Sequence, residues 1–268
     1  VRGRERSRQP EDILREFTEL VDRGYKDITL LGQNVNSYGK KLDREFDFAD
    51  LLQLLCTVKG DYVIHFMSSH PRDFTKKVID VIRDNPQISR QIHLPVQAGN
   101  DRILKEMNRH YTIEQYMDII NYAREQIQGV TFSTDIIVGF PGETFEEYLD
   151  TERLVKGVRF TQIFNYIYSK RNGTRAAKME DNITHEEKAR WLNRLIAIQR
   201  DITFDYLNEY IGKTERALVE EKNGDMYTAR LQNTFVVKFI CKNDHTDEFV
   251  NLKITGKRGT TLIADIIE

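Results

Sequence analysis

The chain has 268 residues, and its 40 Lys and Arg against 42 Asp and Glu give a formal net charge of −2. This balance gives no bulk sign of a nucleic-acid binder, and 40% hydrophobic residues are enough for a sizeable core. No apolar run is long enough to span a bilayer and no signal-peptide core opens the chain, which excludes a membrane protein and favours a cytoplasmic location.

Helices and short strands alternate over roughly the first 170 residues. The patterns predict helices at 10–24, 48–58, 74–83, 101–107, 113–127 and 145–155, and strands at 28–31, 62–67, 92–96, 131–138 and 161–168. Strands separated by helices favour βα units and a parallel sheet. Because a full barrel has eight strands, the sequence predicts an α/β fold with a partial, open parallel β/α barrel, or a doubly wound sheet.

A different pattern follows a long helix predicted at 185–210. Short strand-like runs with turn residues between them occupy 216–220, 226–231, 235–241, 249–255 and 261–267. Such a small all-β module is typical of a closed, OB-like barrel. We therefore expect two domains, 1–206 and 207–268.

Polar residues and glycines follow each predicted strand of the first domain. These segments are 32–39, 68–72, 93–100, 135–144 and 166–174. In parallel βα folds the carboxyl ends of the strands carry the chemistry. The sequence therefore predicts a polar ligand site along this edge.

Several common site patterns are absent from the sequence. It has no phosphate-binding loop, no dinucleotide-binding glycine turn and no His-Glu-x-x-His zinc motif. The pair Ser69-His70 is not by itself a nucleophile and base, so no catalytic residue is assigned. Cys56 and Cys241 cannot complete a four-ligand metal site, and we interpret both as buried small apolar residues. No metal ligand is expected in this chain.

Six segments, in order, carry a family resemblance. They are VRGRERSR at 1–8, LLGQNVNSYG at 30–39, SSHP at 68–71, HLPVQ at 93–97, MNR at 107–109 and STDIIVGFPGET at 133–144. Over essentially its whole length the chain resembles the radical S-adenosylmethionine (SAM) methylthiotransferases, and its last module resembles their RNA-binding TRAM domain. The loop at 32–39 is similar to that of the MiaB-type branch, which methylthiolates carbon 2 of N6-isopentenyladenosine at position 37 of tRNA, beside the anticodon.

The resemblance implies a radical mechanism with two 4Fe-4S clusters. In the family, a Cys-x-x-x-Cys-x-x-Cys loop holds the cluster that cleaves SAM, and the resulting radical takes a hydrogen from carbon 2 of the adenine. A second cluster, held by an N-terminal domain, delivers the methylthio group. This chain has neither set of three cysteines and starts at Val1. We therefore expect an inactive fragment with no bound cluster.

The resemblance also implies which residues bind the cofactor SAM. Gly32, Gln33 and Asn34 would face its methionine part, and Ser69 and His70 its ribose or the substrate. Gln97 would line the same site, and Val138, Gly139 and Glu143 would contact the adenine. The alternatives are an Asx-type turn for the first group, a structural histidine for His70, and favourable charge at a helix start for Glu143.

The expected macromolecular partner is the tRNA anticodon stem-loop, with sulfur and electron donors and a monomeric chain. Basic residues are its predicted contacts: Arg2, Arg4, Arg6, Arg8, Lys213, Arg216, Arg230, Lys253, Lys257 and Arg258. The arginines at 2–8 could instead bind the cofactor carboxylate or be solvated. Phe235 and Phe239 are expected in the barrel core.

Two other hypotheses remain open at this point. A methylthiotransferase of the same family could act on threonylcarbamoyladenosine in tRNA or on a ribosomal protein. A non-catalytic RNA-binding protein could keep the barrel without the clusters.

Overall fold

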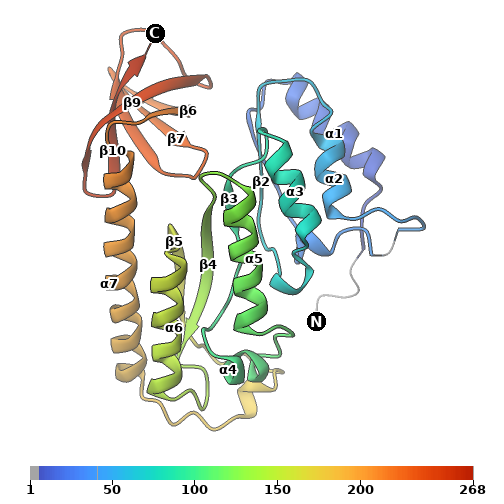
Figure 1. The fold of residues 1–268 in the computed structure, drawn as a ribbon, viewed down its shortest axis with the longest axis vertical. Helices are drawn as coiled ribbons and strands as arrows, with labels where there is room; N and C mark the ends of the chain where they lie inside the picture. Colours follow the sequence, from blue (N-terminus) through green and yellow to red (C-terminus); the bar gives the residue numbers. More distant parts are fainter. Residues whose placement is uncertain (1–5, 41, 268) are drawn as a thin grey trace. The chain divides into compact units, whose positions relative to one another are not determined.

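The computed structural model describes residues 6–40 and 42–267, which form an α/β part followed by an all-β barrel (Figure 1). The helices of the α/β part are α1 (Pro10–Asp22), α2 (Phe48–Leu55), α3 (Lys76–Asp84), α4 (Asp101–Glu106), α5 (Ile113–Gln126), α6 (Phe145–Val158) and α7 (His185–Tyr210). Its strands are β1 (Asp27–Leu30), β2 (Val63–Phe66), β3 (Gln91–His93), β4 (Thr131–Val138) and β5 (Gln162–Ile167). The predicted alternation is confirmed.

Some bounds differ from the prediction for local reasons. α3 begins at Lys76 rather than at residue 74, because the Thr75 side chain accepts a hydrogen bond from Val78 N and caps the helix. β3 ends at His93, just before Leu94 and Pro95, and proline has no N–H to give to a sheet. Short 3-10 turns that were not predicted follow β1 and β2, at Val35–Ser37 and Pro71–Asp73.

The chain divides into two compact units, which we describe separately. Unit 1 comprises Val1–Pro95 and Gln115–Val130, and unit 2 comprises Val96–Glu114 and Thr131–Glu268. In unit 1, β1 and β2 pair in parallel from Asp27↔Val63 to Leu30↔Phe66. Buried aromatic rings attach the helices to these strands: Phe17 of α1 lies edge-on to Tyr62 at 5.1 Å, and Phe48 of α2 lies edge-on to Phe66 at 5.3 Å.

In unit 2, β4 and β5 pair in parallel from Ser133↔Gln162 to Val138↔Ile167. α6 and α7 pack together beside these strands (Figure 1). Tyr148 of α6 stacks on Trp191 of α7 at 5.1 Å and donates a 2.7 Å hydrogen bond to its carbonyl. None of the helices in the described part of the chain is both long and apolar enough to cross a membrane.

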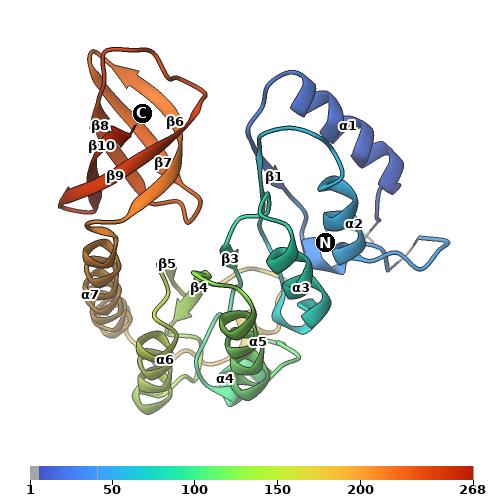
Figure 2. The ribbon, with the colours of Figure 1, turned by 45° about the horizontal axis from the view of Figure 1, so that its top comes forward.

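The C-terminal module of unit 2 is a closed barrel with the strand order β10-β8-β7-β6-β9 (Figure 2). Its strands are β6 (Thr214–Asn223), β7 (Met226–Leu231), β8 (Val236–Ile240), β9 (Phe249–Arg258) and β10 (Thr261–Ile267). Alternate residues point inward, as the sequence patterns predicted.

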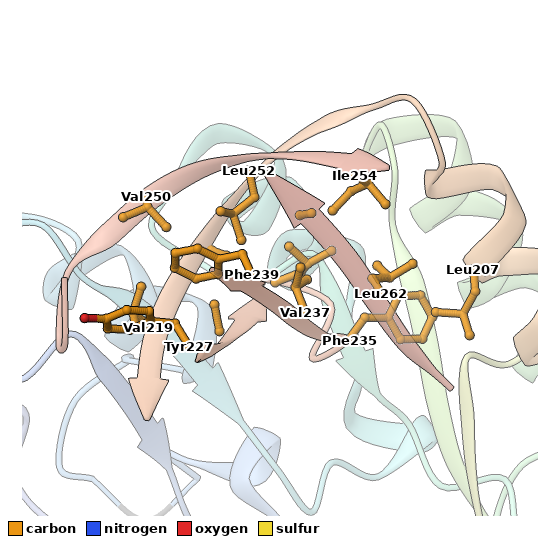
Figure 3. Close-up of a cluster of buried hydrophobic side chains, with 14 residues drawn as sticks. Leu207, Val219, Tyr227, Phe235, Val237, Phe239, Val250, Leu252, Ile254 and Leu262 are labelled. Carbon is orange, nitrogen blue, oxygen red and sulfur yellow. The ribbon is translucent and has the colours of Figure 1, made fainter. Parts of the chain in front are cut away.

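The barrel interior is filled by aliphatic and aromatic side chains (Figure 3). Phe235 and Phe239 belong to this core, as expected, and Tyr227 stacks on Phe239 at 5.4 Å. Leu207 of α7 is part of the same core. The division between 206 and 207 stays a prediction, because the end of α7 and the barrel share buried side chains.

Candidate functional site

The loops that follow β1 and β2 in unit 1 are joined by paired amides. Asn36 Nδ2 donates to the His70 carbonyl at 2.9 Å, and Asn36 Oδ1 accepts from His70 N at 2.8 Å. His70 Nδ1 accepts from Arg72 N at 3.3 Å and caps the 3-10 turn that follows. Part of the amide-rich motif therefore holds the two loops together.

In the loops after β1 and β2, Asn34 Oδ1 and Ser69 Oγ are buried without a hydrogen-bond partner among the described residues. Asn34 is held in place because its Nδ2 donates to Asp73 Oδ2 at 2.7 Å. Burial acts to raise the pKa of Asp73, but hydrogen bonds from Arg72, Lys40 and Asn34 lower it well below its usual range. Unsatisfied buried atoms are costly, so Asn34 Oδ1 and Ser69 Oγ each suit a polar group of a ligand.

The other residues predicted after β1 are less enclosed. Gly32 and Gln33 are exposed, and His93 at the end of β3 is buried, as expected for a structural histidine. Of the residues predicted after β1 and β2, Asn34 and Ser69 therefore have buried polar atoms, whereas Gly32 and Gln33 are exposed.

In unit 2, Glu143 organises the turn between β4 and α6. Its Oε2 accepts from Gly139 N at 2.7 Å and from Phe140 N at 3.1 Å, and the residue is 4% exposed. Burial raises the pKa of Glu143 to about 7, against the opposing effect of these backbone hydrogen bonds. The carboxyl group therefore holds the turn, which supports a positioning role and leaves contact with a ligand to neighbouring backbone.

Gly139 occupies a place in this turn that a larger residue could not. Its φ is +69°, and an added Cβ would lie 2.6 Å from Lys188 Cδ. Lys188 of α7 is 4% exposed, and its Nζ pairs with Asp181 at 2.6 Å. The buried aliphatic part of the Lys188 side chain thus packs directly against Gly139 and covers one side of the turn.

A cavity of about 1030 Å³ opens within unit 2 at the carboxyl ends of β4 and β5. Its lining consists of Gln97, Glu106, Met107, Asn108, Arg109, Asp135, Ile137, Phe140, Tyr166, Ile167, Tyr168, Ser169, Arg171, Thr174, Arg175 and Ala176. Of the predicted cofactor-binding residues, Gln97 lines this cavity, and Val138 and Gly139 are buried in the chain just before Phe140.

Gln97 has an unusual backbone conformation for a residue that is not glycine. Its φ is +74°, while its N donates to Asp135 O and its O accepts from Ile137 N, both at 2.9 Å. Strain of this kind persists where the surrounding structure enforces it, often at binding sites. The Tyr168 hydroxyl is buried on the same cavity without a hydrogen-bond partner among the described residues.

Sequence reasoning did not select several of the cavity residues. Arg109, Tyr166, Arg171 and Arg175 line it, although 107–109 was recognised as a motif, Tyr166 and Arg171 lie in the segment 166–174, and Arg175 directly follows that segment. For Tyr166 and Arg171, the sequence signal that could have identified them was therefore their position in a segment that follows a strand. The path of the loops, which decides what lines the cavity, has no short sequence pattern.

The basic barrel residues that were predicted to bind RNA differ in what they contact. Lys253 Nζ donates to Gly212 O at 2.5 Å, Lys257 Nζ donates to Phe204 O at 3.2 Å, and Lys213 lies over the Tyr210 ring. These three lysines surround the junction of α7 and the barrel. The bonds of Lys253 and Lys257 to carbonyls support a structural role for these two residues beside any contact with RNA.

The other predicted arginines have different surroundings. Arg230 pairs with Glu220 through two hydrogen bonds of 2.6 and 3.0 Å, Arg216 lies 3.7 Å from the centre of the Phe249 ring, and Arg258 is exposed. Near the N-terminus, Arg8 pairs with Glu16 at 2.6 Å and Arg6 is exposed. Arg2 and Arg4 lie outside the described residues.

The cysteines do not fit an iron–sulfur cluster. Cys56 lies in unit 1 and Cys241 in unit 2, and both are partly buried rather than fully so. Burial raises the pKa of Cys56 to about 11, opposite to what a thiolate ligand needs. Among residues 6–40 and 42–267, no group of three or more Cys, His, Asp or Glu side chains is arranged to hold a metal.

The parallel strands, the polar edge and the turn after β4 define a class of protein. The family model of the radical SAM superfamily matches residues 1–155, and the chain belongs to this superfamily. Its α/β fold is that of a partial radical SAM barrel. The coproporphyrinogen III oxidase HemN from Escherichia coli superposes with a TM-score of 0.54 at 18% identity over 84% of this chain and 61% of that one. The methyltransferase TsrM from Kitasatospora setae gives 0.50 at 12% identity over 82% and 36%.

Within the superfamily, the similar curated proteins carry one name. The chain is 49% identical to a tRNA-2-methylthio-N(6)-dimethylallyladenosine synthase of Clostridium beijerinckii, over 99% of this chain and 59% of that protein. It is 45% identical to the protein of that name from Thermoanaerobacter pseudethanolicus, over 100% and 58%. The chain therefore spans about three fifths of the length of these relatives.

Proposed function

We propose that the chain is part of an enzyme that adds a methylthio group to carbon 2 of N6-isopentenyladenosine in tRNA, using SAM. The observation that carries this proposal is the 45–49% identity to synthases of that name, which runs through both the α/β part and the barrel. Sequence similarity limited to the barrel, or similarity only to the superfamily in general, would not favour this substrate. The reaction would take place in the cytoplasm.

The residues present fit SAM. In unit 1, the buried Asn34 Oδ1 and Ser69 Oγ have no hydrogen-bond partner among the described residues, which suits the amino group or hydroxyls of this cofactor. In unit 2, Glu143 fixes the turn at Gly139 and Phe140, and the stem of Lys188 covers Gly139, so contact of Val138 and Gly139 with the adenine rests on the family resemblance alone. When bound, SAM supplies the group that activates carbon 2 of the adenine; the chain's own residues bind and orient it.

The residues present do not fit either iron–sulfur cluster, so no step is derived through one. We infer that the ligands of both clusters come from outside these 268 residues, and that the chain alone does not catalyse the reaction. Electron and sulfur donors would act on that other part of the enzyme. Among the predicted contacts to the anticodon stem-loop, Arg6 and Arg258 are exposed.

The test is mass spectrometry of tRNA nucleosides from a strain that lacks the gene. We expect 2-methylthio-N6-isopentenyladenosine to disappear and the unthiolated isopentenyl form to accumulate. The whole gene should restore it, and the 268-residue chain alone should not. Loss of a methylthiolated threonylcarbamoyladenosine, or an unchanged profile with an altered ribosomal protein, would refute this substrate in favour of another branch. No change in either would favour a non-catalytic RNA-binding protein.

A further inference from the structure

One side of the cavity in unit 2 is formed by a loop between β5 and α7, which we call the cavity loop (residues 169–183). It contributes Ser169, Arg171, Thr174, Arg175 and Ala176 to the lining. None of the residues of this loop is buried. A segment without buried side chains opens easily unless specific interactions hold it. The shape of the cavity therefore depends on how the loop is attached to the rest of the unit.

Two ion pairs join the cavity loop to the rest of the described chain. Arg175 lies 3.5 Å from Glu106 of α4, and the arginine side chain is 81% exposed. Asp181 lies 2.6 Å from Nζ of Lys188 of α7, and the lysine side chain is 6% exposed. The other hydrogen bonds of the loop within the described chain are internal to it. Because exposed ion pairs contribute little, the pair of Asp181 and Lys188 is the stronger attachment.

Lys188 contacts three separate segments with one side chain. Its Nζ lies 5.7 Å from the centre of the Tyr168 ring, directly before the cavity loop, and pairs with Asp181 near the end of that loop. A cation is attracted to the face of an aromatic ring. The aliphatic carbons of Lys188 pack against Gly139 in the turn after β4. Lys188 therefore connects both ends of the cavity loop to this turn.

Packing alone does not explain a lysine at this position. Burying an ammonium group removes it from water, and a buried ion pair is often no more stabilising than apolar side chains of similar volume. Methionine is unbranched and flexible, so it could cover Gly139 with a similar stem. What the ammonium group adds is a directional partner, because it fixes where the carboxylate of Asp181 lies.

We propose that Lys188 is a positioning residue, whose ion pair with Asp181 holds the cavity loop in the conformation that lines the cavity. The two parts of the side chain then have separate roles: the stem supports the turn at Gly139, and the ammonium group holds the loop. Without the ammonium group the loop would populate open conformations, and a ligand that contacts the loop would have to order it first.

Hydrogen–deuterium exchange of the whole gene product tests the loop directly. Lys188→Met keeps the stem and removes the charge, so exchange should become at least about five-fold faster in residues 169–183 and stay unchanged in β4. Asp181→Asn should act in the same direction, and the double variant should exchange no faster than Lys188→Met, because both changes break one interaction. Lys178→Met, at an exposed position of the loop, is the matched control and should exchange like the parent.

A kinetic measurement separates positioning from support of the fold. It rests on the proposed function, which makes tRNA the substrate of the whole enzyme. Lys188→Met should raise the KM for tRNA at least about three-fold and leave kcat within about two-fold, because only molecules with an ordered loop are competent to bind. Lys178→Met should keep the KM of the parent.

Unchanged exchange of the cavity loop in Lys188→Met would overturn the inference, as would equally fast exchange in Lys178→Met. Faster exchange in β4 as well would assign Lys188 to the fold rather than to the loop, and an unchanged KM would show that the loop does not need to be held. The exchange measurement involves no substrate. An enzyme that leaves tRNA unmodified therefore refutes the proposed function, and exchange alone then decides whether Lys188 holds the loop.

Discussion

The small barrel and the cavity edge of β4 and β5 belong to one compact unit, yet they use their residues in opposite ways. The barrel turns alternate side chains inward until its interior is filled, and Arg230 meets Glu220 on its surface. At the cavity edge, Gln97 is held at a φ of +74° and the Tyr168 hydroxyl has no partner in the described chain. The barrel also has a buried hydroxyl without a partner in the described chain, that of Tyr227, and a positive φ at Thr234 and Asp247. What distinguishes the edge is that its strained and unsatisfied groups line a cavity.

The largest expected effect tests the barrel. Leu252 is fully buried in the barrel core, so Leu252→Ala should lower the free energy of unfolding by about 3 to 4 kcal/mol through lost apolar burial and a cavity. Urea unfolding followed by circular dichroism measures it. Ile240→Ala, at a position 68% exposed on the outer surface, is the control and should change stability by less than about 0.5 kcal/mol. Equal losses in both variants would contradict a core that carries the stability.

The next effect tests the edge. Gly139→Ala should lower the free energy of unfolding by about 2 to 3 kcal/mol, because φ is positive and the new methyl group meets the buried stem of Lys188. Gly142→Ala is the matched control, since Gly142 has a φ of +77° but open space around it, and we expect a loss of only about 1 kcal/mol. If the two variants unfold at the same urea concentration, Lys188 does not close the turn.

A third effect, similar in size to that of Gly139→Ala over its whole range, is a pH dependence at the same turn. Burial raises the pKa of Glu143 to about 7 from 4.5, so over that interval the folded protein holds the proton more tightly than the unfolded chain. The free energy of unfolding should therefore fall as the pH rises toward 7, by about 1 kcal/mol per pH unit, and level off above it.

The variant Glu143→Gln tests whether the pH dependence of stability comes from this carboxyl group and not from another. The neutral amide oxygen can still accept from Gly139 N and Phe140 N, so the variant should fold and lose the slope. Glu146→Gln, at an exposed position of α6, should keep it. Urea midpoints measured from pH 5 to 7, the interval just below the raised pKa of Glu143, provide the comparison. A slope that survives in Glu143→Gln would assign the titration to another group.

The sequence predicted the elements best where local signals agree with packing. The helix at 185–210 and the strands at 131–138, 226–231 and 261–267 match the structure to the residue. α7 has a capping box between Thr184 and Glu187, and β7 and β10 alternate between inside and outside.

The candidate site was predictable in part. The segments that contain the glycine-rich turn and Gln97 were selected from their positions after strands, and the family resemblance selected the individual residues; the structure places them at a cavity or in a tightly held turn. The roles of Lys188 and Arg171 were not predictable, because one lies on a helix rich in charged residues and the other in a loop without a regular pattern. What these two residues contact depends on tertiary folding, which periodicity does not encode.

The length of α7 has a consequence for how unit 2 works. Lys188 near its beginning covers the turn at Gly139, and Leu207 near its end is part of the barrel core. These 19 helical steps correspond to about 28 Å at 1.5 Å per residue. The length of the helix therefore sets the distance between the barrel and the turn. One inserted residue would lengthen it by only about 1.5 Å but rotate the barrel by about 100°, so its residue number sets an orientation as well as a distance.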